Sequence, residues 1–244
     1  MNTKAIASEM IVGSLQIAVM RKPVKNLHLN VLPPHGQVRV SVPPTMHEEA
    51  VRTFVASKLP WIRRQITKFQ SQARETKRSY ISGESHYFQG KRYLLRVVES
   101  ENKKGKVEIK NKRYLDLHVP ATASVSKKEK IMEDWYRAEL KKQVTNILPK
   151  WEQKIGEQTN EWHIRRMKTK WGTCNVKAKR IWLNLELAKK PAHCVEYILV
   201  HELVHLLERS HNDRFVGLMS KYMPDWKTRQ QELNNFVLSY DTWE

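Results

Sequence analysis

The sequence has few cysteines and no long hydrophobic run. Its two cysteines, Cys174 and Cys194, are too few for a scaffold held by disulfides. The apolar stretch MIVGSLQIAVM near the start is interrupted by Ser14 and Gln16 and is too short to span a bilayer. It also lacks the basic leader and the small-residue cleavage site of a signal peptide. These absences predict a cytoplasmic protein with reduced thiols and no membrane partner.

Negative charge is scarce as well. The chain of 244 residues has 25 acidic side chains against 44 basic ones, a net charge of +19. Residues 1–200 hold 39 basic and 18 acidic side chains, a balance of +21, whereas residues 201–244 hold 5 and 7, a balance of −2. A strongly basic surface favours anionic partners such as nucleic acids, nucleotides or acidic substrates. A solubilising coat of lysine without a partner explains the same charge equally well.

The pattern of apolar residues predicts an α+β fold, with strands placed ahead of a helical end. No internal repeat or low-complexity tract is visible. Strand periodicity occurs at residues 14–20, 27–33, 37–43, 87–99, 105–111 and 114–120. Helical spacing is predicted at residues 46–72 with a break at Pro60, at 126–156, at 191–210, and in two helices on either side of Pro224. Residues 163–175 and 180–187 are predicted to form a hairpin.

Three regions follow from this order of elements. Residues 1–80 are expected to form a small, β-rich, ββα-like region. Residues 81–160 contain short strands and a long helix, and residues 161–244 contain the candidate catalytic residues. An alternative is that residues 81–244 form one domain together with residues 1–80.

The segment HELVH, residues 201–205, carries the clearest chemical signal. Positions i and i+4 share one face of a helix, so His201 and His205 can direct two ring nitrogens at one point. Zinc binds imidazole nitrogen at roughly 2.0–2.1 Å, and Glu202 can reach a water at the metal without being a ligand. Hydrogen-bonded core histidines are the alternative, but this helix is apolar, and an unliganded cluster of these groups would be costly to bury there.

A catalytic zinc takes three protein ligands and leaves one position open. Glu208 follows His201 by seven residues, which is roughly 10 Å along a straight helix and therefore too far. The polar segment RSHND suits a chain reversal after Arg209 or Ser210. We therefore expect His211 to be the third ligand.

The segments MKTKWGTCN, IWLNLEL, VEYILVHELVHLLERSHNDRF and MPDW resemble the YgjP-like metallohydrolase family, which is similar to SprT-like and WLM zinc metallopeptidases. The clearest match covers residues 163–233, and the N-terminal strands and the stretch SGE…FQGKRYLL extend it over nearly the whole chain. The resemblance implies a zincin-like catalytic domain with His201, His205 and His211 as zinc ligands and Glu202 as general base. Manganese, cobalt or nickel would also suit imidazole ligands.

The resemblance also places the segment from Trp171 to Cys174 beside the metal cleft. Gly172 is expected to let substrate backbone approach closely, and Cys174 is a further candidate ligand, although a structural role is favoured for both. Cys194 is expected to pack in the core. Candidates for substrate binding or for stabilising developing charge, each with a surface or packing role as the alternative, are Trp171, Gly172, Arg165, Arg166, Tyr222 and Arg229.

Three functions are compatible with these residues. In the first, a peptidase, zinc lowers the pKa of its water and Glu202 takes the proton. In the second, the same chemistry acts on a nucleoside triphosphate such as UTP as a pyrophosphatase, with basic residues holding the phosphates. The third is a nucleic-acid-associated zinc protein without turnover. A closed structural zinc site needs four ligands and no base, so Glu202 argues against the third function.

Overall fold

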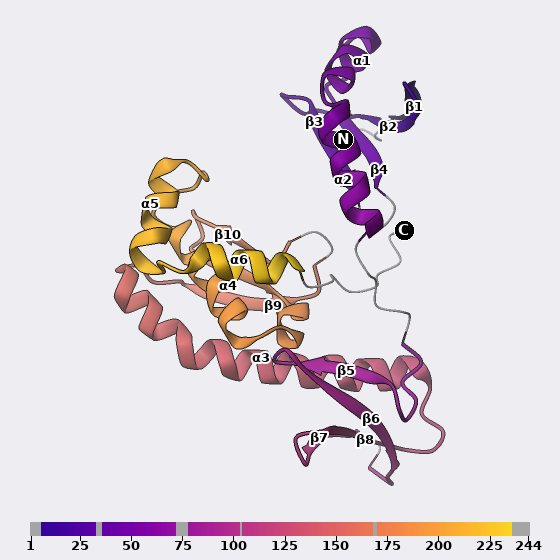
Figure 1. The fold of residues 1–244 in the computed structure, drawn as a ribbon, viewed down its shortest axis with the longest axis vertical. Helices are drawn as coiled ribbons and strands as arrows, with labels where there is room; N and C mark the ends of the chain where they lie inside the picture. The colour runs from indigo at the N-terminus through magenta and orange to yellow at the C-terminus, as the bar shows by residue number, and fades with distance from the viewer. Residues whose placement is uncertain (1–5, 33–35, 72–77, 103, 168–169, 236–244) are drawn as a thin grey trace. The chain divides into compact units, whose positions relative to one another are not determined.

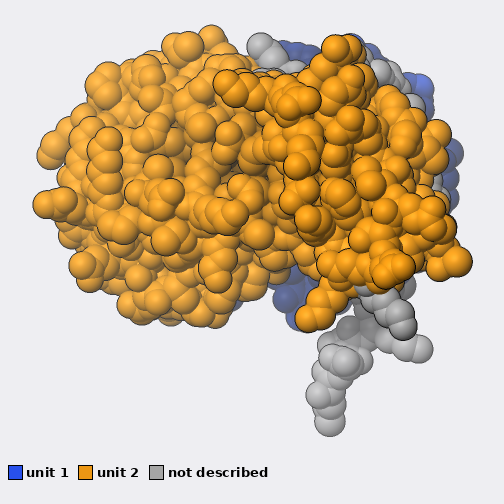
Figure 2. Space-filling view, turned by 90° about the horizontal axis from the view of Figure 1, so that it is seen from below, with its two compact units in different colours: residues 1–74, 241–244 blue, residues 75–240 orange. Residues whose placement is uncertain are grey.

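A computed structural model describes residues 6–32, 36–71, 78–102, 104–167 and 170–235 (Figure 1). It contains both helices and strands, which confirms the α+β fold class. The chain divides into two compact units, residues 1–74 with 241–244 and residues 75–240 (Figure 2). The three regions expected from the sequence stay a prediction. None of the helices in the described part of the chain has the length and apolar character that crossing a membrane requires.

The first unit is a four-stranded sheet with two helices. Its strands are β1 (Ile6–Val12), β2 (Leu15–Arg21), β3 (His28–Leu32) and β4 (Gln37–Val42), in the order β1-β2-β4-β3. The helices are α1 (Glu48–Ser57) and α2 (Leu59–Ser71). The break between them falls at Lys58, so Pro60 occupies the first turn of α2, where its missing N–H costs nothing. The alternating apolar residues of β2 and β4 and one face of each helix close the core.

The second unit begins with a sheet of the same topology. Its strands are β5 (Ser85–Phe88), β6 (Lys91–Glu99), β7 (Lys106–Lys110) and β8 (Tyr114–Val119), in the order β5-β6-β8-β7. In both sheets the first two strands form an antiparallel hairpin, the second strand runs parallel to the fourth, and the third pairs antiparallel with the fourth. The structure therefore contains one four-stranded arrangement twice. No repeat is visible in the sequence because the two copies share topology rather than side chains.

Helix α3 (Val125–Ile155) links that sheet to the rest of the second unit. The Ser124 side chain accepts a hydrogen bond from the Lys127 backbone N–H, and Gly156 ends the helix at a φ of 82°. Its buried side chains recur every three or four residues and form one apolar stripe: Met132, Tyr136, Leu140, Val144, Leu148, Trp151 and Ile155. The helix predicted at residues 126–156 is confirmed, and its N-terminal cap is Ser124.

A small sheet and three further helices complete the second unit. The strands β9 (Glu161–Arg165), β10 (Gly172–Asn175) and β11 (Arg180–Asn184) have the order β10-β11-β9. A 3-10 helix (Leu185–Lys189) leads to α4 (Ala192–Val204), which is followed by α5 (Asp213–Tyr222) and α6 (Trp226–Asn235). The break at Pro224 is confirmed. The strand β10 lies at the edge of its sheet.

The hairpin predicted from residues 163–175 and 180–187 is only partly right. Strand β10 pairs antiparallel with β11, but the segment that contains His163 is a separate strand, β9, on the other side of β11 and parallel to it. A parallel neighbour needs a longer connection than a hairpin does, and residues 166–179, which include β10, form this connection between β9 and β11. Alternation of apolar residues identifies strands but carries no information about which edge each strand joins.

Candidate active site

Helix α4 contains the first four residues of the HELVH segment, among them His201 and Glu202. Pro191 precedes its first residue, a position where proline is tolerated. The helix packs on α3, α6 and the small sheet, and its apolar residues are buried on nearly all sides. This explains why the segment YILV, residues 197–200, is a continuous apolar run rather than an amphipathic pattern. His201 and Glu202 therefore stand on a rigid, enclosed element.

The helix ends at Val204, several residues earlier than predicted. The backbone N–H of Leu206 donates to Leu203 and that of Leu207 donates to Val204, both at 3.0 Å, which is the tighter spacing of a 3-10 turn. His205 is the residue that caps the helix. The reversal thus begins immediately after the second histidine, which makes the return of the chain to His211 possible within six residues.

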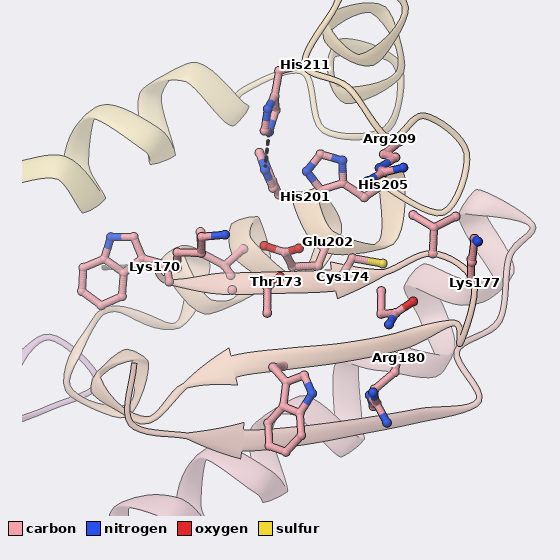
Figure 3. A pocket seen from close by; sticks show the side chains of 16 residues that line it. Lys170, Thr173, Cys174, Lys177, Arg180, His201, Glu202, His205, Arg209 and His211 are labelled. Carbon is pink, nitrogen blue, oxygen red and sulfur yellow. Dashed lines mark hydrogen bonds between the residues drawn. The ribbon is translucent and has the colours of Figure 1, made fainter. Parts of the chain in front are cut away.

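The turn brings the three histidine rings together. Nε2 of His211 lies 3.0 Å from Nε2 of His201, and donor nitrogens of His201, His205 and His211 all lie within 4.8 Å of one another (Figure 3). Asn212 accepts a hydrogen bond from the Phe215 N–H and so starts α5 directly after the third histidine. The Phe215 ring packs against all three imidazoles, with centroids 4.7–4.9 Å away. Local chain geometry and one buried ring hold the cluster.

These residues fit a divalent metal. Nδ1 of His205 lies 3.0 Å from the carbonyl oxygen of Glu208, and since a carbonyl only accepts, this nitrogen carries the proton and leaves the Nε2 lone pair available. Burial, together with the neighbouring His205 and His211, lowers the pKa of His201 to about 3, so its ring is neutral, as a metal ligand must be. Nδ1 of His201 is buried without a hydrogen-bond partner in the described residues, a cost that proteins tolerate mainly at functional positions.

Glu202 lies beside this cluster and is almost fully buried, with 5% of its surface exposed. Burial raises the pKa of its carboxyl group to about 8, and the nearby charge of Lys170 opposes this effect. The Gly172 backbone on β10 passes so close that a Cβ atom there would lie 2.5 Å from Oε1 of Glu202. Gly172 was predicted to make room for substrate; in the structure it makes room for the Glu202 carboxylate.

The cluster opens into a cavity of about 1040 Å³ between α4 and the β10–β11 hairpin (Figure 3). Trp171 and Gly172 line it, as do the three histidines and Glu202. Cys174 also lines the cavity but is absent from the histidine cluster. Burial and the nearby Glu202 raise the pKa of its thiol to about 11, which keeps it protonated and makes it a poor ligand. The other lining residues are Lys170, Thr173, Asn175, Val176, Lys177, Arg180, Trp182, Ile198 and Arg209.

Four of the predicted substrate-binding residues lie elsewhere. Arg165 stacks over the Trp182 ring at 4.9 Å, and Arg166 pairs with Glu133 on α3 at 3.0 Å. The other two interact with the helical end of the unit: Tyr222 donates its hydroxyl to the carbonyl of Ile155, and Arg229 pairs with Glu196 and Asp225. None of the four lines the cavity, because each side chain already contacts a partner in its own surroundings.

Two residues that position the site were missed. One is Phe215, described above. The other is Asn184, which is fully buried at the end of β11. Its side-chain amide donates to the carbonyls of Met167 and Lys170, both at 2.8 Å, and its oxygen accepts from Met167 and Glu186. These hydrogen bonds fix Met167 and Lys170, which precede Trp171 and β10 in the chain. The only signal in the sequence was a polar residue inside the apolar segment IWLNLEL.

A second group of potential ligands, His193, Cys194 and Glu232, lies away from the cavity. His193 and Glu232 already share a hydrogen bond of 2.6 Å, and Cys194 is buried, as predicted, with its thiol pKa raised by burial to about 11. His193 and Cys194 lie in the first turn of α4, where the helix dipole disfavours a cation. This group is therefore a much weaker candidate for a metal than the three histidines.

The fold and this site define a metal-dependent hydrolase of the peptidase type. The chain belongs to the YgjP-like metallopeptidase domain family, whose model matches residues 25–236. No curated protein matches the chain. Two solved structures similar to parts of it are metallopeptidase zymogens, abylysin from Pyrococcus abyssi and jannalysin from Methanocaldococcus jannaschii. Each is 24% identical; abylysin matches over 37% of this chain and 90% of its own, with a TM-score of 0.35, and jannalysin over 38% and 92%, with a TM-score of 0.31.

Proposed function

We propose that the chain is a zinc-dependent peptidase with His201, His205 and His211 as metal ligands and Glu202 as general base. The observation that carries the proposal is the convergence of three ring nitrogens within 4.8 Å beside a buried carboxylate at the bottom of an open cavity. Three nitrogen ligands with one side open are the arrangement of a catalytic zinc site rather than a structural one.

When bound, zinc would supply Lewis acidity, which acidifies water and polarises the carbonyl under attack. The chain itself supplies the proton transfers. Glu202 Oε1 or Oε2 accepts a proton from the attacking water and returns it to the leaving amine. Burial in an apolar helix keeps this carboxylate away from bulk solvent, so its proton is exchanged with the reacting groups. The hydrogen bond between His205 Nδ1 and the Glu208 carbonyl fixes the orientation of the ring whose Nε2 would bind the metal.

The edge strand β10 supports a polypeptide as the substrate of this cavity. Strand β10 is an edge strand, and its residues Gly172–Asn175 line the cavity. An edge strand offers backbone N–H and C=O groups to an extended chain, which can add to the sheet as a further strand. A substrate bound in this way would lie directly across from Glu202, since Gly172 contacts that carboxylate. The half-buried Trp171 beside it offers an apolar surface to a substrate side chain.

The test compares wild type with Glu202→Gln after loading each with zinc. An unfolded protein such as reduced casein is the substrate, and new amino termini are counted. The control is Glu139→Gln, which makes the same change at a half-buried carboxylate on α3 that pairs with Lys142 and does not line the cavity. We expect Glu202→Gln to lose at least about 100-fold in kcat while binding zinc as wild type does, because the general base is removed and the ligands remain. Equal turnover by the two proteins would refute the assignment.

Two other functions stay predictions. Assays of the same two proteins, wild type and Glu202→Gln, test them. Nucleoside triphosphate hydrolysis has one observation in its favour, the four basic side chains that line the cavity. Release of pyrophosphate from UTP by wild type and not by Glu202→Gln would establish it. A nucleic-acid-associated role without turnover predicts salt-dependent retention of DNA and no hydrolysis of either substrate. Loading with manganese, cobalt or nickel in place of zinc tests the choice of metal.

A further inference from the structure

The basic residues that line the cavity differ in their ion pairing from the basic residues around it. The side chains of Lys170, Lys177 and Arg209 are exposed and make no ion pair within the described part of the chain. Among the described residues that line the cavity, Glu202 is the only one with a carboxylate, and it is buried. The mouth of the cavity is therefore a region of uncompensated positive charge.

Neighbouring cations on the same segments are neutralised. Lys179, two residues after Lys177, pairs with Glu157 at 2.9 Å. Arg214, five residues after Arg209, lies 3.9 Å from the Glu208 carboxylate. In the described residues of these segments, carboxylates thus accompany Lys179 and Arg214 outside the cavity, whereas Lys170, Lys177 and Arg209, which line it, have none.

The cations are also arranged unevenly along β10 (Figure 3). Lys170 lies two residues before the strand. At the other end, Lys177 follows the strand, Arg180 is the register partner of Asn175, and Arg209 lies toward the same end of the cavity. Arg180 is partly neutralised by Glu161 at 3.0 Å. Among the described residues, the Lys170 end of the cavity therefore carries one cation without an ion pair, and the Asn175 end carries two together with Arg180.

We propose that the cavity selects polypeptides with acidic side chains on one side of the cleaved bond, the side that lies over the Asn175 end of β10. This inference rests on the proposed peptidase function and adds the substrate class. A four-residue strand is about 13 Å long, so Lys170 and Lys177 are too widely spaced to hold one phosphate group together. An extended polypeptide places a residue about every 3.3 Å and can present carboxylates at such separated positions. Charges in a cleft also steer an oppositely charged substrate toward it.

The test uses four peptides that share one neutral cleavable core. One has flanking glutamines only, two have glutamates on one side or the other, and one has glutamates on both sides. We expect one of the two single-sided peptides to be cleaved about tenfold more efficiently, in kcat/KM, than the neutral peptide at low salt, with the other less than about threefold better. The preference should shrink toward 1 M salt, where charges are screened beyond about 3 Å.

Variants connect the preference to the named residues. Lys177→Ser combined with Arg209→Ser should reduce the ratio of acidic to neutral peptide by about threefold per cation removed. The corresponding change to glutamate should reverse the preference toward peptides with lysine on that side. The matched control is Lys179→Asn, which removes a charge from the same hairpin turn but outside the cavity, and which should leave the ratio as it is in wild type.

A binding measurement separates this inference from the proposed function. Fluorescence anisotropy of the four peptides on zinc-loaded Glu202→Gln reports selection without turnover. Equal affinities of all four peptides, or a preference that Lys177→Ser with Arg209→Ser leaves intact, overturns the inference even if peptides are cleaved. If zinc-loaded Glu202→Gln binds one single-sided acidic peptide more tightly than the others, but wild type cleaves none of them, the inference is supported and the peptidase function is refuted. If DNA and the two single-sided peptides all compete equally for binding, the cavity binds polyanions without selectivity. This result would also overturn the inference.

Discussion

A methyl group on Gly172 would collide with Glu202: its carbon would lie 2.5 Å from Oε1 and 2.9 Å from the carboxyl carbon. The two residues are thirty positions apart in the chain, and the strand β10 is held against α4 at the distance that a glycine allows. The position of the carboxylate thus depends on the absence of a side chain on the facing strand.

Gly172→Ala is therefore expected to impair turnover without removing the metal. Glu202 must move away from its place beside the histidines, and displacements of about 1 Å at a reacting group cost about 100-fold in rate. Steady-state kinetics with an unfolded substrate should show a fall of this size in kcat, while zinc stoichiometry stays at the wild-type value. Gly217→Ala is the control, because nothing lies within 4 Å of the Cβ it would add. Wild-type kcat in Gly172→Ala would contradict the contact.

Removal of zinc is expected to destabilise the protein as well as to inactivate it. A ligand that binds only the folded state stabilises it by about 2.7 kcal/mol when present at 100 times its Kd. Thermal unfolding should therefore shift to lower temperature with a chelator and recover when zinc is added back. In His211→Ala the response to zinc should fall or vanish, because one of the three nitrogens is lost. His193→Ala, in the second group of potential ligands, is the control that should still respond.

Asn184→Leu is expected to destabilise the second unit. The substitution is close in volume but leaves the carbonyls of Met167 and Lys170 and the N–H groups of Met167 and Glu186 without their partner. Each buried polar group left unsatisfied costs about 1–3 kcal/mol. Urea unfolding should show a loss of several kcal/mol, and Trp171 fluorescence should change because the segment before β10 is no longer held. Asn175→Leu, on the exposed end of β10, should cost far less.

Acidification is expected to weaken the fold through His86, away from the metal site. This side chain is 4% exposed, and burial together with the charge of Arg78 lowers its pKa to about 4, although Glu84 opposes the shift. The unfolded chain, with a histidine pKa of about 6.5, binds more protons between these two values. Stability contributed by the neutral ring is thus complete above about pH 6.5 and is lost as the pH falls toward 4.

The size of this effect is at most about 3 kcal/mol. Urea unfolding of wild type and His86→Gln between pH 7.5 and 4 measures it. Relative to wild type, the variant should gain stability as the pH falls through this window, because glutamine has no proton to take up. A difference between the two proteins that does not change with pH would show that His86 does not titrate with a lowered pKa.

The sequence predicted most of the elements in the second unit and the residues of the histidine cluster. A stripe of apolar residues is enough to identify α3, and the spacing of His201 and His205 is enough to place them on one face, since both depend on the period of a single helix. The place of His211 was predicted with the wrong helix end, because the sequence does not show that the last turn tightens after His205. The candidate arginines were the least successful prediction, since the partner of a surface guanidinium depends on segments far away in the chain.

By itself the sequence determined which side chains are available: a histidine, a glutamate and a second histidine at fixed helical spacing, a third histidine after a polar segment, and an excess of basic residues. Those features are local or additive, so they do not depend on how the chain packs. Only the tertiary structure decided that Phe215 packs against the three rings, that Gly172 meets Glu202, and that Lys177 and Arg209 face the cavity without carboxylates. Such contacts join side chains that lie on different elements or on the turns between them, and it is the packing of those elements that brings them within reach.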